Sequence, residues 1–516
     1  MKISKKLLAL ALVAALAVCA CAPLYASAEG VNPYPVIYVD GLATSDIINT
    51  ETGEVVFPFS QETITTAVKN IIGPTLRTLI TGKYELFGDP LLELADTIFG
   101  PMALDGDGNP VYPTTNNPRD NIDLTQDFKR YFIPGVGYTI DYSINMTYDW
   151  RISPVILAED LHDLVEAVCA STGADKVKLV GFSMGTCIVN SYISLYGYDR
   201  LDTVVYVCGA FNGLNSAGEP FAGSIDTSGN AIVNFLPAYL ADDFNGKLIT
   251  ALVDSLNDIG LLGGVARIAK AIVDANKEYV YSEGLAKLFC RWGSLWAFVP
   301  YEYYDDCMEF VEDYADLSDE YKAKIEYYHN EVQGKNEERI QYFLDHGIKT
   351  GIIAKYGYTT PPVVADLDEN ADSVIETKYA SFGATCAKAG ETLGDNYVQA
   401  VDDGHDHISA DNKIDASTCK FPDITWFVKN SQHSQNSCLR ELRKFIVMSD
   451  VQVDVFSDAR FPQFLIADGD TVVPLTAETN EEAHTFGSRG IRESFSRMFA
   501  LIRALIEWIK ARLTAG

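Results

Sequence analysis

The sequence predicts an α/β fold: a doubly wound, mostly parallel sheet with a large helical cap insertion. Strand-like and helix-like segments alternate between residues 29 and 213, which is the pattern of parallel strands joined by crossover helices. A second block of this kind covers residues 346–440. Between the two blocks, residues 214–345 have mainly helical apolar spacing, and this segment is the predicted insertion.

Residues 1–28 have the organisation of a signal peptide. A lysine-rich start is followed by the apolar run 7–18, which is too short to span a membrane, and by the small-residue cleavage site Ala26-Ser27-Ala28. We expect cleavage after Ala28 and a secreted mature chain. Attachment of a lipid at Cys21 is the alternative route of export.

The composition is strongly acidic. The chain has 71 acidic and 40 basic side chains, and its formal net charge is −31. Such a charge disfavours nucleic acid as a partner and disfavours tight docking on anionic lipid by charge alone. It is typical of a secreted protein that self-repulsion keeps in solution.

The first strand is predicted at residues 35–39, and the loop Asp40-Gly41-Leu42-Ala43 follows it. Further along, residues 157–170 have the spacing of an amphipathic helix and lead into the apolar run 177–180. These segments fit the strand and helix alternation of a parallel sheet.

The strand at 177–180 ends in Gly181-Phe182-Ser183-Met184-Gly185, which has the pattern G-x-S-x-G. In α/β-hydrolases this pattern is a sharp turn from a buried strand into a helix, and it exposes a nucleophilic serine above the sheet. Residues 186–196 continue as an apolar run without Gly or Pro, as the helix requires. Ser183 is therefore the predicted nucleophile.

Acyl chemistry at a serine needs two N–H donors for the oxyanion. In serine hydrolases of this fold, one donor follows the nucleophile and the other lies in the loop after an early strand. This arrangement predicts the backbone N–H groups of Met184 and Leu42 as the oxyanion hole.

The segment Tyr148-Asp149-Trp150-Arg151-Ile152-Ser153-Pro154 resembles the corresponding segment of the lecithin:cholesterol acyltransferase, lysosomal phospholipase A2 and phospholipid:diacylglycerol acyltransferase family. The first strand and its loop are also similar, although Asp40 replaces a proline and Ala43-Thr44 replace leucine-glycine. The resemblance implies an α/β-hydrolase that forms an acyl-serine and passes the acyl group to water or an alcohol. The Trp150 segment is interpreted as architecture, not as part of the site.

Residues 214–345 are expected to cover the carboxyl ends of the strands, where a lid or acyl-binding cap would lie. Its predicted helices include 265–279 and 319–344, the latter with Ser318 as N-cap. The aromatic stretch 292–304 either contributes to substrate binding or forms the core of the insertion itself.

The general base must come after Ser183 in chain order. His329 and His346 belong to the helical insertion, and His405 and His407 lie in an Asp-rich loop with no strand before it. His433 follows the β-type run 423–430, as a base at the end of a late strand should. It is the predicted base.

The acid is suggested by resemblance. Residues 371–377 look like the family's acidic loop, in which an aspartate shortly precedes a small or polar residue and valine, and this implies Asp372. Asp366, Asp368 and Asp415 are fallback acids.

A rival pair is Asp470 with His484. The sequence of residues 464–474 is a good match to an acidic loop. However, no strand is predicted between Asp470 and His484, and this pairing leaves the β-type run before His433 without a role. Asp468-Gly469-Asp470 is then a surface turn, with the alternative of a cation site, in a C-terminal extension at residues 441–516. This extension ends in an amphipathic helix at 491–513, which packs on its own domain or contacts lipid.

Eight cysteines remain after residue 28, and none has metal-type spacing. Cys290 with Cys307, and Cys386 with Cys419, are the disulfide pairings that an oxidising compartment would permit. Cys187 and Cys208 lie in apolar runs and are expected to be buried free thiols.

Together these features predict a secreted serine hydrolase or acyltransferase that acts on a lipid or another acyl ester and makes transient contact with a membrane or micelle surface. The proposed chemistry requires no cofactor and no metal. Peptide hydrolysis by the same triad is an alternative, and a degenerate hydrolase that binds lipid or another surface is the non-enzymatic one.

Overall fold

The computed structural model describes residues 34–480 except 117–130, 134–136, 140–142, 225–261, 362–363, 365–367 and scattered positions between 61 and 80. The predicted signal peptide, His484 and the predicted tail helix lie outside the described residues. Within the described part, no helix is both long and apolar enough to cross a membrane.

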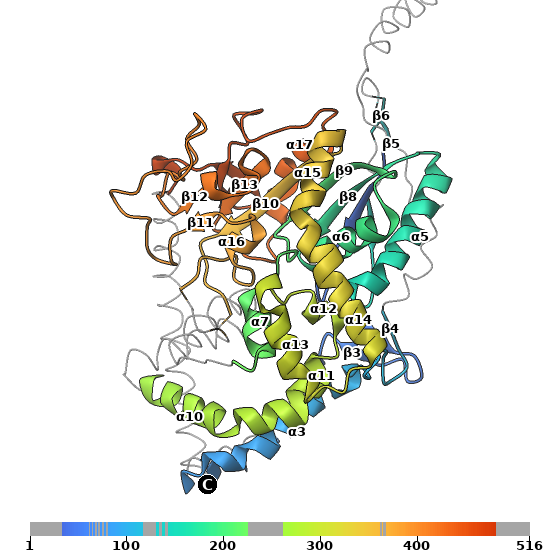
Figure 1. Cartoon of the computed structure of the whole chain (residues 1–516), viewed down its shortest axis with the longest axis vertical. Helices are drawn as coiled ribbons and strands as arrows, with labels where there is room; N and C mark the ends of the chain where they lie inside the picture. Colours follow the sequence, from blue (N-terminus) through green and yellow to red (C-terminus); the bar gives the residue numbers. More distant parts are fainter. Residues whose placement is uncertain are drawn as a thin grey trace, which may run out of the picture.

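An eight-stranded sheet forms the centre of the molecule (Figure 1). In spatial order its strands are β15 (Thr471–Pro474), β14 (Phe464–Asp468), β13 (Thr425–Lys429), β10 (Lys349–Tyr356), β9 (Leu201–Val207), β8 (Val177–Phe182), β1 (Val36–Val39) and β7 (Ser143–Met146). All neighbours are parallel except β14 and β15, which are antiparallel. The predicted fold class is confirmed.

Helices cover both faces of this sheet. The alternation of side chains along β8 sends Val177 and Leu179 to one face and Val180 and Phe182 to the other. The first face packs on α5 (Pro154–Thr172) and α6 (Met184–Tyr196), and the second packs on α17 (Arg440–Val447). Each buried Val, Leu or Phe contributes about 1.5–3 kcal/mol, so the two apolar layers hold the strands together.

The winding of the sheet changes direction between β1 and β8. From β1 the chain moves to β7 at one edge, then returns to β8 on the other side of β1 and continues outward through β9 and β10. In open α/β sheets such a switch opens a crevice at the carboxyl ends of the two strands. Here those ends are Asp40 after β1 and Ser183 after β8.

The sheet continues into the range assigned to a C-terminal extension. β14 and β15 lie beyond residue 440 and complete the main sheet, so the predicted boundary at 440–441 does not mark its edge. The physical reason is burial: Leu465 and Ile466 are 0 % and 2 % exposed and pack between β13 and the turn to β15. Asp468 to Asp470 do form an exposed turn, as predicted.

The described part of the insertion is helical. Its helices are α7 (Asn215–Phe221), α10 (Leu262–Val280), α11 (Ala286–Phe289), α12 (Gly293–Trp296), α13 (Tyr304–Glu312), α14 (Asp319–Tyr327) and α15 (Asn336–His346). Ser318 caps α14 by accepting the N–H of Tyr321 at 3.2 Å. Phe221, Trp296 and Tyr321 belong to a separate apolar core of this segment.

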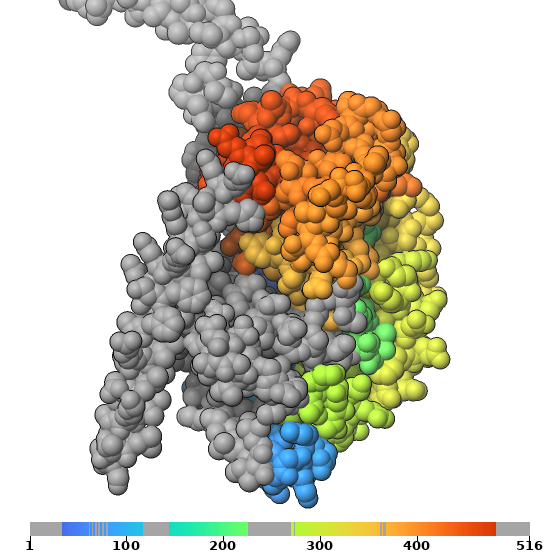
Figure 2. Space-filling model, turned by 90° about the vertical axis from the view of Figure 1, so that its left-hand side faces the viewer, coloured from blue at the N-terminus to red at the C-terminus, as the bar shows by residue number. Residues whose placement is uncertain are grey.

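The last of these helices belongs to the sheet domain. Ile340 and Phe343 of α15 are buried in the same core as Ile352 of β10, so α15 acts as the crossover helix before that strand. The insertion therefore ends before α15, earlier than the predicted residue 345. Figure 2 shows the helical segment in yellow and green below the orange and red second part of the sheet domain.

Smaller elements complete the chain. They are β2 (Ile47–Asn49), β3 (Val55–Phe57), α3 (Gly88–Phe99), β4 (Thr114–Asn116), β5 (Tyr131–Ile133), β6 (Gly137–Thr139), α16 (Thr377–Ala380), β11 (Thr385–Cys386) and β12 (Ile414–Asp415). The eight cysteines of the described residues are free thiols, so the structure forms neither of the two disulfides considered.

Candidate active site

Ser183 stands in a strained turn between β8 and α6. Its backbone has φ 49° and ψ −120°, a region that non-glycine residues rarely adopt. The flanking glycines permit this close turn: a Cβ on Gly185 would lie 1.9 Å from the carbonyl oxygen of Val39, and one on Gly181 would lie 2.9 Å from Thr186. The predicted elbow is thus present, with a serine at its apex.

The two residues predicted to supply the oxyanion donors, Leu42 and Met184, lie close to Ser183. Met184 is the first residue of the 13-residue helix α6, and the first N–H groups of a helix have no partner within it. Leu42 lines the same cavity as Ser183. The loop before Leu42 comes so close that a Cβ on Gly41 would lie 2.9 Å from Ser183 Cβ.

Tyr148 holds this loop in place, a role that the sequence analysis did not assign. Its buried hydroxyl contacts the carbonyl oxygens of Asp40 and Gly41. Nearby, Trp150 donates its Nε1–H to Ser45 O at 3.0 Å, and the buried Arg151 pairs with Asp149 at 2.6 Å. This agrees with the interpretation of the segment as architecture, and the Tyr148 hydroxyl connects it to the loop after β1.

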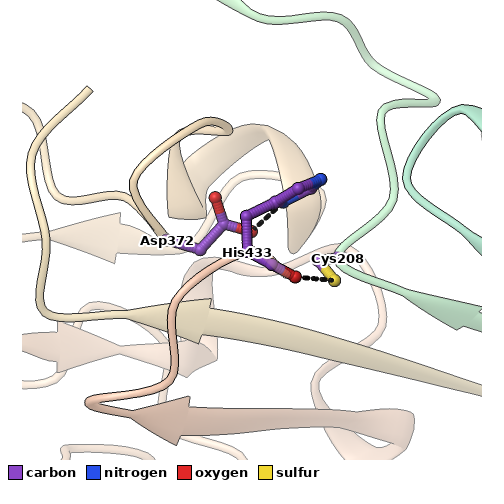
Figure 3. Close-up of side chains that lie close together, drawn as sticks. All are labelled: Cys208, Asp372 and His433. Atoms are coloured by element: carbon purple, nitrogen blue, oxygen red, sulfur yellow. Dashed lines mark hydrogen bonds and ion pairs between the residues drawn. The ribbon is translucent and has the colours of Figure 1, made fainter. Parts of the chain in front are cut away.

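Asp372 and His433 contact each other directly (Figure 3). Nδ1 of His433 lies 2.6 Å from Oδ2 of Asp372, and the backbone N–H of His433 donates to the Asp372 carbonyl at 2.7 Å. The other carboxylate oxygen accepts the N–H groups of Val374 at 3.0 Å and Ile375 at 2.8 Å. The carboxylate is therefore held from three sides and directed at the imidazole.

The charges around Asp372 and His433 favour an imidazole that can accept a proton. Burial by itself raises the pKa of Asp372, but His433, Lys355 and the N–H of Ile375 outweigh it and hold the pKa below its usual value. An ionised Asp372 favours a proton on Nδ1 of His433, which leaves Nε2 as a proton acceptor. Ser183 and His433 both line one cavity.

Lys355 fixes the loop that carries His433. Its ammonium group, on the 1 % exposed side chain of β10, donates to the carbonyl oxygens of Gln432 at 2.8 Å, His433 at 3.0 Å and Gln435 at 3.1 Å. A fourth acceptor is Oδ1 of Asn436 at 2.8 Å. The sequence analysis missed this residue: the lysine in the otherwise apolar run 351–356 marks a buried charge but does not reveal its partners.

Cys208 is a thiol close to this site. It follows β9, and its sulfur lies 3.8 Å from the carbonyl oxygen of His433 (Figure 3). Cys208, Asp372 and His433 each offer a ligand-type atom within 4.8 Å of the others. Burial raises the pKa of the Cys208 thiol to about 12, so it stays protonated at neutral pH and does not compete with Ser183 as nucleophile.

The cavity in front of Ser183 has a volume of about 1110 Å³, and both the insertion and the sheet domain line it with apolar and polar groups. The insertion contributes apolar side chains, which are Leu214, Ala217, Pro220, Phe221, Phe289, Leu295 and Phe298. The sheet domain contributes polar groups, which include Asp40, Asn145, Ser434, Asn436, Arg440 and Arg443.

The alternative acids lie elsewhere or have other partners. Asp415 is buried and accepts Ser417 N–H, Ala400 N–H and the Tyr397 hydroxyl, each at 2.9 Å. Asp368 is exposed. Asp366 lies outside the described residues.

In the alternative pair, Asp470 with His484, the aspartate lies in a different environment from Asp372. Asp470 is exposed in the turn between β14 and β15 and contacts Ser437 at 3.4 Å. Its predicted partner His484 lies outside the described residues. β15 stands between the two positions in the chain, a strand that the sequence analysis did not predict.

Comparison with known proteins gives only distant similarities. No protein-family model matches the chain, and no curated protein matches its sequence. Among solved structures, the Tle4–Tli4 complex is 13% identical over 63% of this chain and 75% of that chain, with a TM-score of 0.23. A protein from Burkholderia cenocepacia proposed to be an aryl esterase is 13% identical over 61% and 90%, with a TM-score of 0.16. The resemblance in the Tyr148 segment therefore has no counterpart in these comparisons.

Proposed function

We propose that this protein is a serine hydrolase that cleaves acyl esters through an acyl-serine intermediate on Ser183. The observation that carries the proposal is the convergence on one cavity of a serine in a strained elbow and a histidine whose Nδ1 lies 2.6 Å from a buried carboxylate. An arrangement of this kind raises the nucleophilicity of a hydroxyl group.

The reaction would proceed in two steps. His433 Nε2 takes the Ser183 proton as Oγ attacks the ester carbonyl, and the N–H groups of Leu42 and Met184 stabilise the oxyanion. Collapse of the intermediate expels the alcohol, which receives the proton from His433. Water, or a second alcohol in an acyl transfer, then attacks the acyl-serine by the same path, and the proton returns to Ser183.

We further propose lipid acyl esters as the substrate class. The apolar side chains from α7, α11 and α12 support this choice, because they border the cavity that an acyl group bound to Ser183 Oγ would occupy. The resemblance of residues 148–154 to the acyltransferase family points to the same class.

The test combines active-site labelling with turnover of defined esters. A fluorophosphonate probe should label the full chain, and Ser183→Ala should abolish both labelling and hydrolysis of p-nitrophenyl esters. Asp372→Asn and His433→Ala should each lower kcat by about 10³-fold or more. Long-chain esters should be preferred to acetate esters and to peptides.

Matched controls separate the two candidate pairs. Asp470→Asn and His484→Ala should leave labelling and turnover unchanged. Loss of labelling in these variants, with full activity in Asp372→Asn and His433→Ala, would contradict the assignment. An unlabelled Ser183 in a folded chain that still binds lipid would instead favour a degenerate hydrolase with a binding role.

A further inference from the structure

A second cluster of ligand-type atoms lies outside the cavity of Ser183. Asp403, His407 and Asp423 each offer one ring nitrogen or carboxylate oxygen, and these atoms lie within 4.8 Å of one another. None of the three side chains lines the cavity described above. Asp403 and His407 belong to one loop, whereas Asp423 lies in the turn Pro422–Ile424 that leads into β13.

The tautomer of His407 is fixed by a buried glutamine. Gln463 donates its Nε2–H to the carbonyl oxygen of Pro422 at 2.8 Å, so its Oε1 is the atom that faces Nδ1 of His407, at 2.6 Å. An amide oxygen can only accept, and Nδ1 must therefore carry a hydrogen. In a neutral imidazole the free lone pair is then on Nε2.

That lone pair faces negative charge. Nε2 lies 2.9 Å from Oδ2 of Asp403, whose other oxygen accepts the N–H of His405 at 3.0 Å. The carboxylate of Asp423 adds a second acceptor. A cation between the three groups would bring their acceptor atoms together without repulsion, and the imidazole itself is 0 % exposed.

We propose that Asp403, His407 and Asp423 bind a divalent transition-metal ion, with Zn²⁺ as the best match. Zn²⁺ takes imidazole nitrogen and carboxylate oxygen as ligands, and water can complete a four-coordinate site. Two carboxylates balance its charge. The Nδ1–H of His407 donates to Oε1 of Gln463, and a hydrogen bond of this kind orients a metal-binding histidine.

The position of the cluster suggests what the ion would do. It would join the Asp403 loop to the start of β13, the strand whose far end leads to His433, and thereby reduce the freedom of both segments. The side chain of Asp403 is 36% exposed, which gives an ion access from solvent. Figure 2 shows this part of the chain, in orange, at the surface of the molecule.

The experiment measures metal content and affinity in the full chain. Protein that has been treated with a chelator and dialysed should take up one Zn²⁺ per chain, measured by plasma mass spectrometry and by calorimetric titration, and Ca²⁺ should bind far more weakly. Asp423→Asn and His407→Gln should each weaken Zn²⁺ binding at least tenfold. Asp402→Asn, an exposed acid of the same loop, is the matched control and should bind Zn²⁺ as the unmodified chain does.

Asp423→Asn keeps the proposal testable if His407→Gln fails to fold, because Asp423 is exposed and its backbone contacts stay intact. Failure of the unmodified chain to bind Zn²⁺, or unchanged binding by Asp423→Asn, would overturn the proposal. The contact between His407 and Asp403 would then be a simple ion pair of a protonated imidazole. Esterase activity does not enter this test, so its outcome is independent of the function proposed for Ser183.

Discussion

The strained backbone of Ser183 lowers the stability of the fold but positions the hydroxyl group at the cavity. A non-glycine residue with φ 49° destabilises the fold by about 1–3 kcal/mol. The close packing of Gly181 and Gly185 against the neighbouring helix and strand keeps Ser183 in this conformation. The cost should be measurable, because glycine adopts this conformation without strain.

We therefore predict that Ser183→Gly unfolds at the same or a higher denaturant concentration than Ser183→Ala. At Ser194, in the regular part of α6, glycine should instead be about 1 kcal/mol less stable than alanine. Urea unfolding of the four variants gives the comparison. Equal glycine penalties at both positions would show that Ser183 is not strained.

Glu376 is a second residue with an unfavourable environment. It is 0 % exposed, and Oε1 accepts the N–H of Asn215 at 3.2 Å, while Oε2 has no hydrogen-bond partner among the described residues. Burial raises its pKa from 4.5 to about 7. The folded chain thus binds a proton more tightly than the unfolded chain at this position.

The sign of the pH effect follows from this difference. The stabilising contribution is fully present below about pH 4.5 and is lost as the pH rises through about 7. We predict that the free energy of unfolding falls less between pH 5 and pH 8 in Glu376→Gln than in the unmodified chain, by up to roughly 3 kcal/mol. Urea unfolding at both pH values tests this, with the exposed Glu338→Gln as control. An unchanged pH dependence in Glu376→Gln would contradict it.

At the level of elements, strand β10 positions the base through Lys355. The four acceptors of its ammonium group are all in the segment 432–436, so this loop is attached to the centre of the sheet by one side chain. A buried lysine is costly unless its charge is satisfied, which makes this attachment specific.

We predict that Lys355→Met lowers kcat at least tenfold, because the loop with His433 loses its anchor. Lys178→Met is the matched control: Lys178 is equally buried, and it donates to Val447 O at 2.6 Å near the start of β8, away from Ser183. Both variants should lose stability. Equal kcat values for the two folded variants would mean that Lys355 has only a structural role.

The sequence predicted those elements whose signals are local. The elbow is a five-residue pattern between a strand and a helix, and His433 follows a strand that is visible in the sequence. β14 was missed because a short apolar run that ends in Asp468 resembles an acidic loop as well as a strand. Lys355 was missed because its partners lie 77 to 81 residues away, and no local pattern reveals such contacts.

For the whole molecule, the net charge of −31 is the dominant electrostatic feature. Repulsion among carboxylates disfavours the compact state, and salt screens it. We predict that the unfolding temperature rises when NaCl increases from about 10 mM to about 150 mM, as the screening length falls from about 30 Å to about 8 Å. Scanning calorimetry tests this, and choline chloride should have the same effect. A lower unfolding temperature at the higher salt concentration would show that local ion pairs outweigh the net repulsion.

The order of the strands also has a consequence for the newly made chain. Ser183 comes from β8 and His433 from the segment after β13, and β9 and β10 lie between them in the sheet. A chain whose synthesis stops before residue 433 lacks the histidine. In a complete chain the two side chains come together only after the four adjacent strands β8, β9, β10 and β13 have assembled. If Ser183 attacks esters as proposed, a half-made or unfolded polypeptide is inert, and the cell that synthesises it is protected until maturation is finished.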